Sequence, residues 1–171
     1  MRKTIEIANI EDLANLTSTV SSSMSQTTNQ IRDVETGLEL FSLMKFGGVG
    51  CDPLDLDRGL NIIEQINQAF TYLASFRATE ILFGLHPEEA PFRLNLGTAP
   101  GSDIESISGT VAAEVFASVT PTNNQKLKKD IDKVAATAAN YKYSFFMCPK
   151  FEPGRQRDFD RNGVQVWALE L

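Results

Sequence analysis

Residues 102–131 read SDIESISGTVAAEVFASVTPTNNQKLKKDI, and this stretch decides the expected fold. It contains two β-rich runs, 103–107 and 110–119, separated by a Ser-Gly pair that is typical of a tight hairpin turn. A Thr-x-x-Gln capping box at Thr122 follows, and it predicts a helix that ends near Ala139. We therefore expect a strand–strand–helix unit here.

With Ser108-Gly109 as a two-residue turn, Asp103 lies directly opposite Glu114, because each lies four residues beyond the pair that closes the turn. Opposed residues on neighbouring strands share a face, with Cβ atoms about 4.5–5.5 Å apart. Two carboxylates at this distance repel each other, and a divalent cation held by both would remove the repulsion. A three-residue turn would instead place Asp103 on the opposite face from Glu114. The predicted metal site therefore depends on the turn.

Segments on both sides of this stretch complete a mixed α/β pattern. Apolar residues at helical spacing predict helices over 10–46 and 53–83, and Asp52-Pro53 predicts the start of the second helix. Runs typical of strands span 93–97, 141–148 and 164–171. A helix between strands 110–119 and 141–148 is a crossover between parallel neighbours. The expected fold class is α/β with a mixed central sheet, preceded by an N-terminal helical region.

This arrangement resembles the PD-(D/E)XK nuclease superfamily, in which an Asp begins one hairpin strand and an acid-x-Lys lies on the next, before a helix. The resemblance covers residues 53–148 and implies a restriction-endonuclease-like topology. It implies that Asp103 and Glu114 are the first and second catalytic acids and the Mg²⁺ ligands. Glu64, on the preceding helix, is the natural third metal ligand, with Glu80 behind it. The implied activity is hydrolysis of DNA phosphodiesters by a Mg²⁺-activated water, with Mn²⁺ as a substitute in vitro.

The chain departs from the motif at one position. Phe116 stands two residues after Glu114, where the superfamily has lysine, and a phenyl ring neither donates a hydrogen bond nor carries charge. Some members relocate the lysine to the following helix, which makes Lys126 the preferred catalytic lysine here and Lys129 the second choice. Without such a replacement the site is degenerate, and the fold serves binding only.

The apolar stripe along residues 10–46 is narrow, and its other face is rich in Ser, Thr, Gln and Asn. A narrow apolar stripe of this kind binds a partner helix or a second copy of the chain, or the helix packs with it on its own domain. We expect residues 1–46 to form an N-terminal helical segment and residues 47–171 to form the nuclease-like core. A nuclease this small needs two copies to cut both DNA strands, so we expect a homodimer through the N-terminal helices.

The 171 residues carry a net charge of −6, which disfavours a nucleic-acid partner, but the acids are unevenly distributed. Residues 101–171 contain nine acids and nine bases, and the bases gather in two runs: Lys126, Lys128, Lys129 and Lys133, then Lys150, Arg155, Arg157 and Arg161. Three lysines of the first run, Lys126, Lys129 and Lys133, are expected with Asp130 on the helix face opposite its apolar stripe. Each run is either a solvated surface or a phosphate-binding face.

Several classes of protein are excluded by composition. Cys51 and Cys148 are far apart with no CxxC pattern, and His86 is the only histidine, which excludes disulfide scaffolds and cysteine-built or multi-histidine zinc sites. No run approaches 18 apolar residues, and the N-terminus lacks a hydrophobic secretion segment. We expect a cytoplasmic protein with no membrane partner.

Three functions remain open. The first is a metal-dependent DNA endonuclease of a restriction or defence type. The second is a catalytically degenerate nuclease-like fold that acts in DNA binding or assembly, which Phe116 and the net charge favour. The third is an unrelated α/β protein whose acids are structural. Metal binding separates the first from the other two, and nucleic-acid binding at low salt separates the second from the third.

Overall fold

The computed structural model describes residues 2–32, 34, 37–97 and 99–170. The chain divides into two compact units, one formed by Met1–Leu13 and Ala74–Leu171 and the other by Ala14–Leu73. The boundary expected after residue 46 lies inside the second unit. No helix among the described residues is long and apolar enough to cross a membrane.

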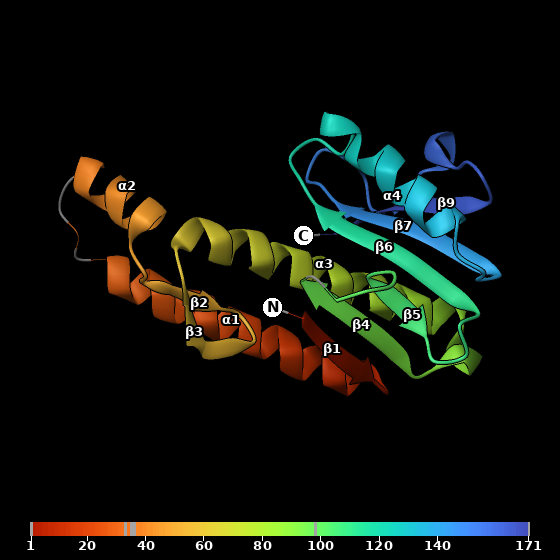
Figure 1. Ribbon diagram of the computed structural model, residues 1–171, viewed down its shortest axis with the longest axis horizontal. Coiled ribbons are helices and arrows are strands. Elements are labelled where there is room, and N and C mark those ends of the chain that lie inside the picture. The colour runs from red at the N-terminus through yellow and green to blue at the C-terminus, as the bar shows by residue number, and fades with distance from the viewer. Residues whose placement is uncertain (1, 33, 35–36, 98, 171) are drawn as a thin grey trace. The chain divides into compact units, whose positions relative to one another are not determined.

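The first unit is built on a seven-stranded mixed sheet with the strand order β1-β4-β5-β6-β7-β9-β8 (Figure 1). Antiparallel pairing joins β1, β4, β5 and β6, while β6, β7 and β9 are parallel and β8 is antiparallel to β9. The strands are β1 Arg2–Ile7, β4 Phe92–Gly97, β5 Ile104–Ser106, β6 Val111–Ala117, β7 Tyr141–Met147, β8 Gly154–Arg155 and β9 Val164–Leu169. The expected α/β class with a mixed sheet is confirmed.

The register of the β5–β6 hairpin agrees with the sequence-based expectation. Ile104 pairs with Ala113 and Glu105 with Ala112, so one further step of the same register sets Asp103 opposite Glu114. In the turn, Gly109 has a φ of +76°, a conformation that glycine adopts without steric cost. The two acids therefore lie on one face of the sheet.

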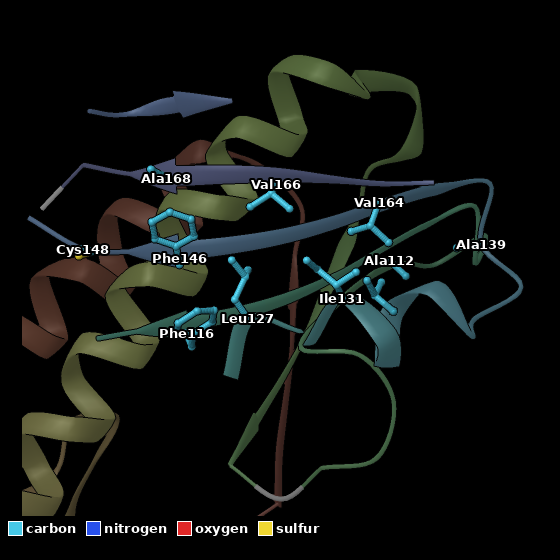
Figure 2. Close-up of a cluster of buried hydrophobic side chains, with 11 residues drawn as sticks. Ala112, Phe116, Leu127, Ile131, Ala139, Phe146, Cys148, Val164, Val166 and Ala168 are labelled. Carbon is cyan, nitrogen blue, oxygen red and sulfur yellow. The ribbon is translucent and has the colours of Figure 1, made fainter. Parts of the chain in front are cut away.

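Helix α4 (Lys126–Ala135) connects β6 to the parallel strand β7 and packs against one face of the sheet. Figure 2 shows Leu127 of α4 beside Phe146 of β7, and Ile131 of α4 beside Ala112 of β6. On β6, Ala112 and Phe116 belong to this core cluster, and residues two apart on a strand share a face, so Glu114 also points to the α4 side. The buried cluster is Ala112, Phe116, Leu127, Ile131, Val134, Ala139, Phe146, Cys148, Val164, Val166 and Ala168.

The opposite face of the sheet lies against the C-terminal part of α3 (Ile62–Leu85), which belongs to the same unit from Ala74 onward. Phe83 of α3 meets Phe92 of β4 edge-on, with 5.2 Å between ring centroids. After the helix, the Nε2 atom of His86 lies 2.7 Å from the Tyr143 hydroxyl of β7, which accounts for the burial of this histidine. A short 3₁₀ helix, η1 (Pro87–Glu89), leads into β4.

The second unit contains most of α1 (Ile10–Ile31), then α2 (Gly37–Phe46), a small hairpin of β2 (Gly50–Asp52) and β3 (Asp55–Leu60), and the start of α3. The Gln65 side chain, near the start of α3, connects α1 and β2 to this helix. Its Oε1 accepts a hydrogen bond of 2.7 Å from the Thr27 hydroxyl of α1 and a longer one from the Cys51 amide of β2.

Several sequence-based boundaries were wrong. The single helix expected over 10–46 is two helices, α1 and α2, and the helix expected from residue 53 begins at Ile62. Asp52 does not cap a helix, because its buried carboxylate accepts hydrogen bonds from the Leu54 amide and from Arg58 and thereby holds the β2–β3 turn. Strand β1 was not predicted.

The expected capping box of the third helix was also wrong. Thr122 makes no side-chain cap, and a 3₁₀ turn, η2 (Asn123–Gln125), precedes α4. Asn124 and Gln125 both have positive φ, at 52° and 56°, so the chain bends sharply before the helix begins at Lys126. The helix ends at Ala135, short of the expected end near residue 139.

The core between α4 and the sheet predicts a large stability effect at Ile131, whose side chain is fully buried. We expect Ile131→Ala to lower the free energy of unfolding by about 3–4 kcal/mol, because it removes apolar contacts and leaves a cavity. Urea unfolding followed by circular dichroism measures this change. The control is Val119→Ala, which is 71% exposed and should change stability by less than about 0.5 kcal/mol. A loss below about 1 kcal/mol at Ile131 would contradict this packing.

Candidate functional site

The site is built around Glu114, in the middle of β6, whose side chain is only 2% exposed. Its Oε2 accepts a 2.8 Å hydrogen bond from the Nζ of Lys133 on α4. Asp103 lies just before β5, and its Oδ2 accepts a 2.8 Å hydrogen bond from the Val115 amide of β6. The hairpin register and this bond hold the two carboxylates side by side, as the sequence predicted.

Hydrogen bonds satisfy only part of the buried Glu114 carboxylate. Its Oε1 atom is buried and has no hydrogen-bond partner among the described residues. The same is true of the hydroxyl of Ser144, which is paired with Glu114 in the register of β6 and β7. A buried polar atom without a partner costs about 1–3 kcal/mol, so this arrangement weakens the fold. A buried oxygen without a partner at this position therefore calls for an explanation other than stability.

The electrostatics of the site move the pKa of Glu114 into the neutral range. Burial, and then the negative charge of Asp103, raise the pKa of Glu114 to about 7, although Lys133 opposes the shift. Burial also raises the pKa of Asp103, which Lys133 and Lys126 counteract. Burial of Lys133 lowers its pKa, but the hydrogen bond to Glu114 and the nearby carboxylates outweigh that effect and raise it overall. The groups therefore titrate as one coupled cluster.

Lys126, the lysine preferred from the sequence, lies near the acid pair but does not bond to it. Its Nζ is 2.6 Å from Asp130 Oδ1 and stands over the Phe116 ring, 5.3 Å from the ring centroid. Its charge lowers the pKa of Asp103, so it acts on the pair through space. Lys133 is the lysine that contacts Glu114, and the sequence analysis did not single it out for this role.

Asp130 is a member of the cluster that the sequence analysis missed. We expected it on the outer face of the helix, but it is 4% exposed and its Oδ2 is buried with no partner among the described residues. Burial, above all, raises its pKa. The spacing Lys126, Asp130, Lys133 is the available sequence signal, because residues three and four apart share one side of a helix.

Glu64, the predicted third acid, belongs to the other unit. It forms a capping box at the start of α3, where its Oε2 accepts from the Asn61 amide and its own amide donates to Asn61 Oδ1 at 2.9 Å. A helix cap accounts for this carboxylate, and its role as a metal ligand stays a prediction. Glu80, its alternative, forms an exposed ion pair with Arg77 at 3.0 Å.

No relative identifies the chain. Comparisons with protein-family models, with curated proteins and with solved structures found no match. The chemistry of the site is therefore the basis for any functional inference.

The donor set fits one divalent cation held by two protein carboxylates. Among the described residues, no three side chains of His, Cys, Asp or Glu converge as a metal cage would require. Mg²⁺ does not need such a cage, because it keeps several waters and is commonly bound through one or two carboxylates and substrate phosphates. Asp103 and the unpartnered Oε1 of Glu114 provide oxygen ligands of that kind.

The raised pKa of Glu114 predicts a pH-dependent stability. Between its ordinary pKa of 4.5 and its folded value of about 7, the folded state binds the proton more tightly, so stability falls as pH rises through this window. In EDTA, we expect the wild type to lose up to about 3 kcal/mol relative to Glu114→Gln between pH 5 and pH 8. Asp103, Asp130, Lys126 and Lys133 are present in both proteins, so the difference reports the titration of Glu114 together with its coupling to them. Urea unfolding at each pH measures it, and a pH-independent difference would refute the shift.

Proposed function

We propose that this protein is a metal-dependent phosphodiesterase that acts on DNA, of the kind found among restriction or defence endonucleases. The observation that carries the proposal is the neighbouring pair of half-buried Asp103 and buried Glu114, with Lys133 bonded to Glu114. Two neighbouring carboxylates with a cationic side chain are what metal-assisted hydrolysis of a phosphate ester uses. The substrate class rests on the resemblance to the PD-(D/E)XK nucleases.

The order of elements in the chain supports this resemblance. The order α3–β4–β5–β6–α4–β7, with antiparallel β4, β5 and β6 and parallel β6 and β7, is the order that a restriction-endonuclease-like topology implies. The two acids fall at the start of β5 and in the middle of β6, where the motif has them. We propose this topology as the finer description of the α/β fold.

Asp103 and Glu114 would hold a Mg²⁺ ion, with Mn²⁺ able to replace it in vitro. The bound ion supplies polarisation of the phosphate and lowers the pKa of an attacking water. Lys133 holds its ammonium at Glu114, where it offsets the negative charge that develops on the phosphate. We therefore propose Lys133 in the role of the motif lysine and retain Lys126, over Phe116, as a second cation of the site.

The runner-up is a catalytically degenerate fold that binds DNA or assembles with a partner. Phe116 in the place of the motif lysine favours it, and so do the exposed apolar residues of α2, among them Leu38, Phe41 and Phe46. The same residues support the proposal of a homodimer through the N-terminal helices.

The free, buried thiols of Cys51 and Cys148 fit the reducing cytoplasm, which we propose as the location.

DNA hydrolysis tests the proposal. A mixture of long, unmodified duplex DNAs should be cut in the presence of Mg²⁺ or Mn²⁺ and not in EDTA, since such a mixture contains most short target sequences. We expect Lys133→Met to reduce the rate by about 100-fold or more, because it removes the charge at the reacting phosphate. The matched control is Lys45→Met, an exposed lysine of the other unit, which should leave the rate unchanged.

Two results would contradict this assignment. Cleavage by Lys133→Met at the wild-type rate would remove Lys133 from the mechanism. Absence of cleavage by the folded wild type with either metal, across the whole mixture, would favour the degenerate fold over the nuclease.

A further inference from the structure

The two basic runs of the sequence meet beside α4. Lys128, from the first run, and Arg161, from the second, line one hollow of about 150 Å³. We call this feature the cationic hollow; its lining is Thr122, Gln125, Leu127, Lys128, Phe159 and Arg161. The structure therefore joins two segments that lie more than 30 residues apart in the chain and that the proposed chemistry does not use.

The surroundings of the cationic hollow leave its charge unbalanced. Residues 115–129 contain no Asp or Glu. Asp160, which immediately precedes Arg161, is engaged elsewhere: its Oδ2 accepts two hydrogen bonds from Arg155, and its Oδ1 accepts one from the Val166 amide. Lys128, Lys129 and Arg161 form no ion pair among the described residues. Asp132 on α4 and Asp158 before β9 are exposed acids nearby, but no acid lines the hollow itself, so its lining carries positive charge on a chain whose net charge is −6.

Contacts with the core and the sheet hold in place the two backbone segments that carry Lys128 and Arg161. Arg161 pairs with Val164 through two backbone hydrogen bonds of 2.9 and 3.3 Å. Phe159 packs on Phe146 and Phe151, with ring centroids 6.4 and 5.9 Å apart, which fastens the loop before β9 to the core. On the other side, Leu127 is 3% exposed and anchors the start of α4. Because the backbone at both cations is already fixed, binding an anion orders only their side chains.

The cationic hollow and the acid pair share one helix. Lys128 and Lys133 are five residues apart on α4, which is about 7.5 Å along its axis at about 1.5 Å per residue. A nucleic-acid strand advances about 3.4 Å per nucleotide along a duplex, so neighbouring phosphates of one strand span this distance in about two steps. The two lysines also differ by about 140° around the helix axis, so a strand that contacts both the acid pair and the cationic hollow follows the surface around α4.

We propose that the cationic hollow, with Lys128, Lys129 and Arg161, binds the phosphodiester backbone of a nucleic-acid strand beside the acid pair. The inference rests on the proposed function for the class of polymer, and it holds whether the acid pair hydrolyses that strand or only binds it. The contacts are to phosphate oxygens, so they position the strand without reading its sequence.

Salt-dependent binding tests the inference apart from hydrolysis. The full chain carrying Glu114→Gln is titrated in EDTA into a fluorescent 30-base-pair DNA duplex from 20 to 200 mM salt, and into an RNA duplex of the same sequence. Adding Lys128→Ala and Arg161→Ala should reduce the slope of log Kd against log salt by about 2, since each phosphate contact contributes about 0.9. Lys128→Ala with Lys129→Ala is a second pair that leaves the loop before β9 intact. The control, Arg32→Ala with Lys45→Ala, makes the same change in charge in the other unit and should leave the slope unchanged.

Each result decides the inference. A reduced slope on DNA, on RNA or on both supports it and identifies the polymer, even if the wild type cuts neither. An unchanged slope in both Lys128 pairs, or no binding at 20 mM salt, overturns it, even if the wild type cuts DNA through the acid pair. A reduced slope on heparin alone also overturns it, because the surface would then select a different polyanion.

Discussion

The hydrogen-bonded ion pair of Glu114 and Lys133 is the interaction on which the rest of the site depends. It connects the middle of the sheet to α4, and it places a carboxylate that is 2% exposed among apolar side chains. Only one carboxylate oxygen is paired with a lysine, while the other is buried without a partner. Apolar residues at such a position commonly match or exceed a buried ion pair in stability. The core between α4 and the sheet must therefore offset what Glu114 costs.

Charge alternates along the side of α4 that faces the hairpin. Lys126, Asp130 and Lys133 follow one another on the helix, opposite Asp103 and Glu114 on the strands. Three acids and two lysines leave an excess negative charge, which adds to the effect of burial in raising the pKa of Glu114. A divalent cation would satisfy that excess. Lys128 and Lys129, near the start of the same helix, are exposed and form no ion pair among the described residues, so under the two proposals α4 serves a cation site and an anion-binding surface.

Local rules were sufficient to predict the centre of the sheet. The Ser108-Gly109 turn fixes the register of β5 and β6, and the register fixes the faces of Asp103 and Glu114, so both were predictable without distant contacts. Strand β1 was not, because it pairs with β4 across some 90 residues and has no short-range signal. Lys133 and Asp130 were missed for a related reason: which side of a helix meets a strand depends on packing. Glu64 was assigned from a motif, whereas three-residue spacing to Asn61 already indicated a capping box.

Calorimetric titration of Mn²⁺ into the purified protein tests the central claim most directly, because it needs no knowledge of the substrate. The account predicts saturable binding to the wild type that Glu114→Gln abolishes. Asp132→Asn, an exposed acid of α4 that changes the charge by the same amount, should retain that binding. Absence of binding to folded wild-type protein, or equal binding to Glu114→Gln, would contradict the claim that the buried acid pair is a cation site.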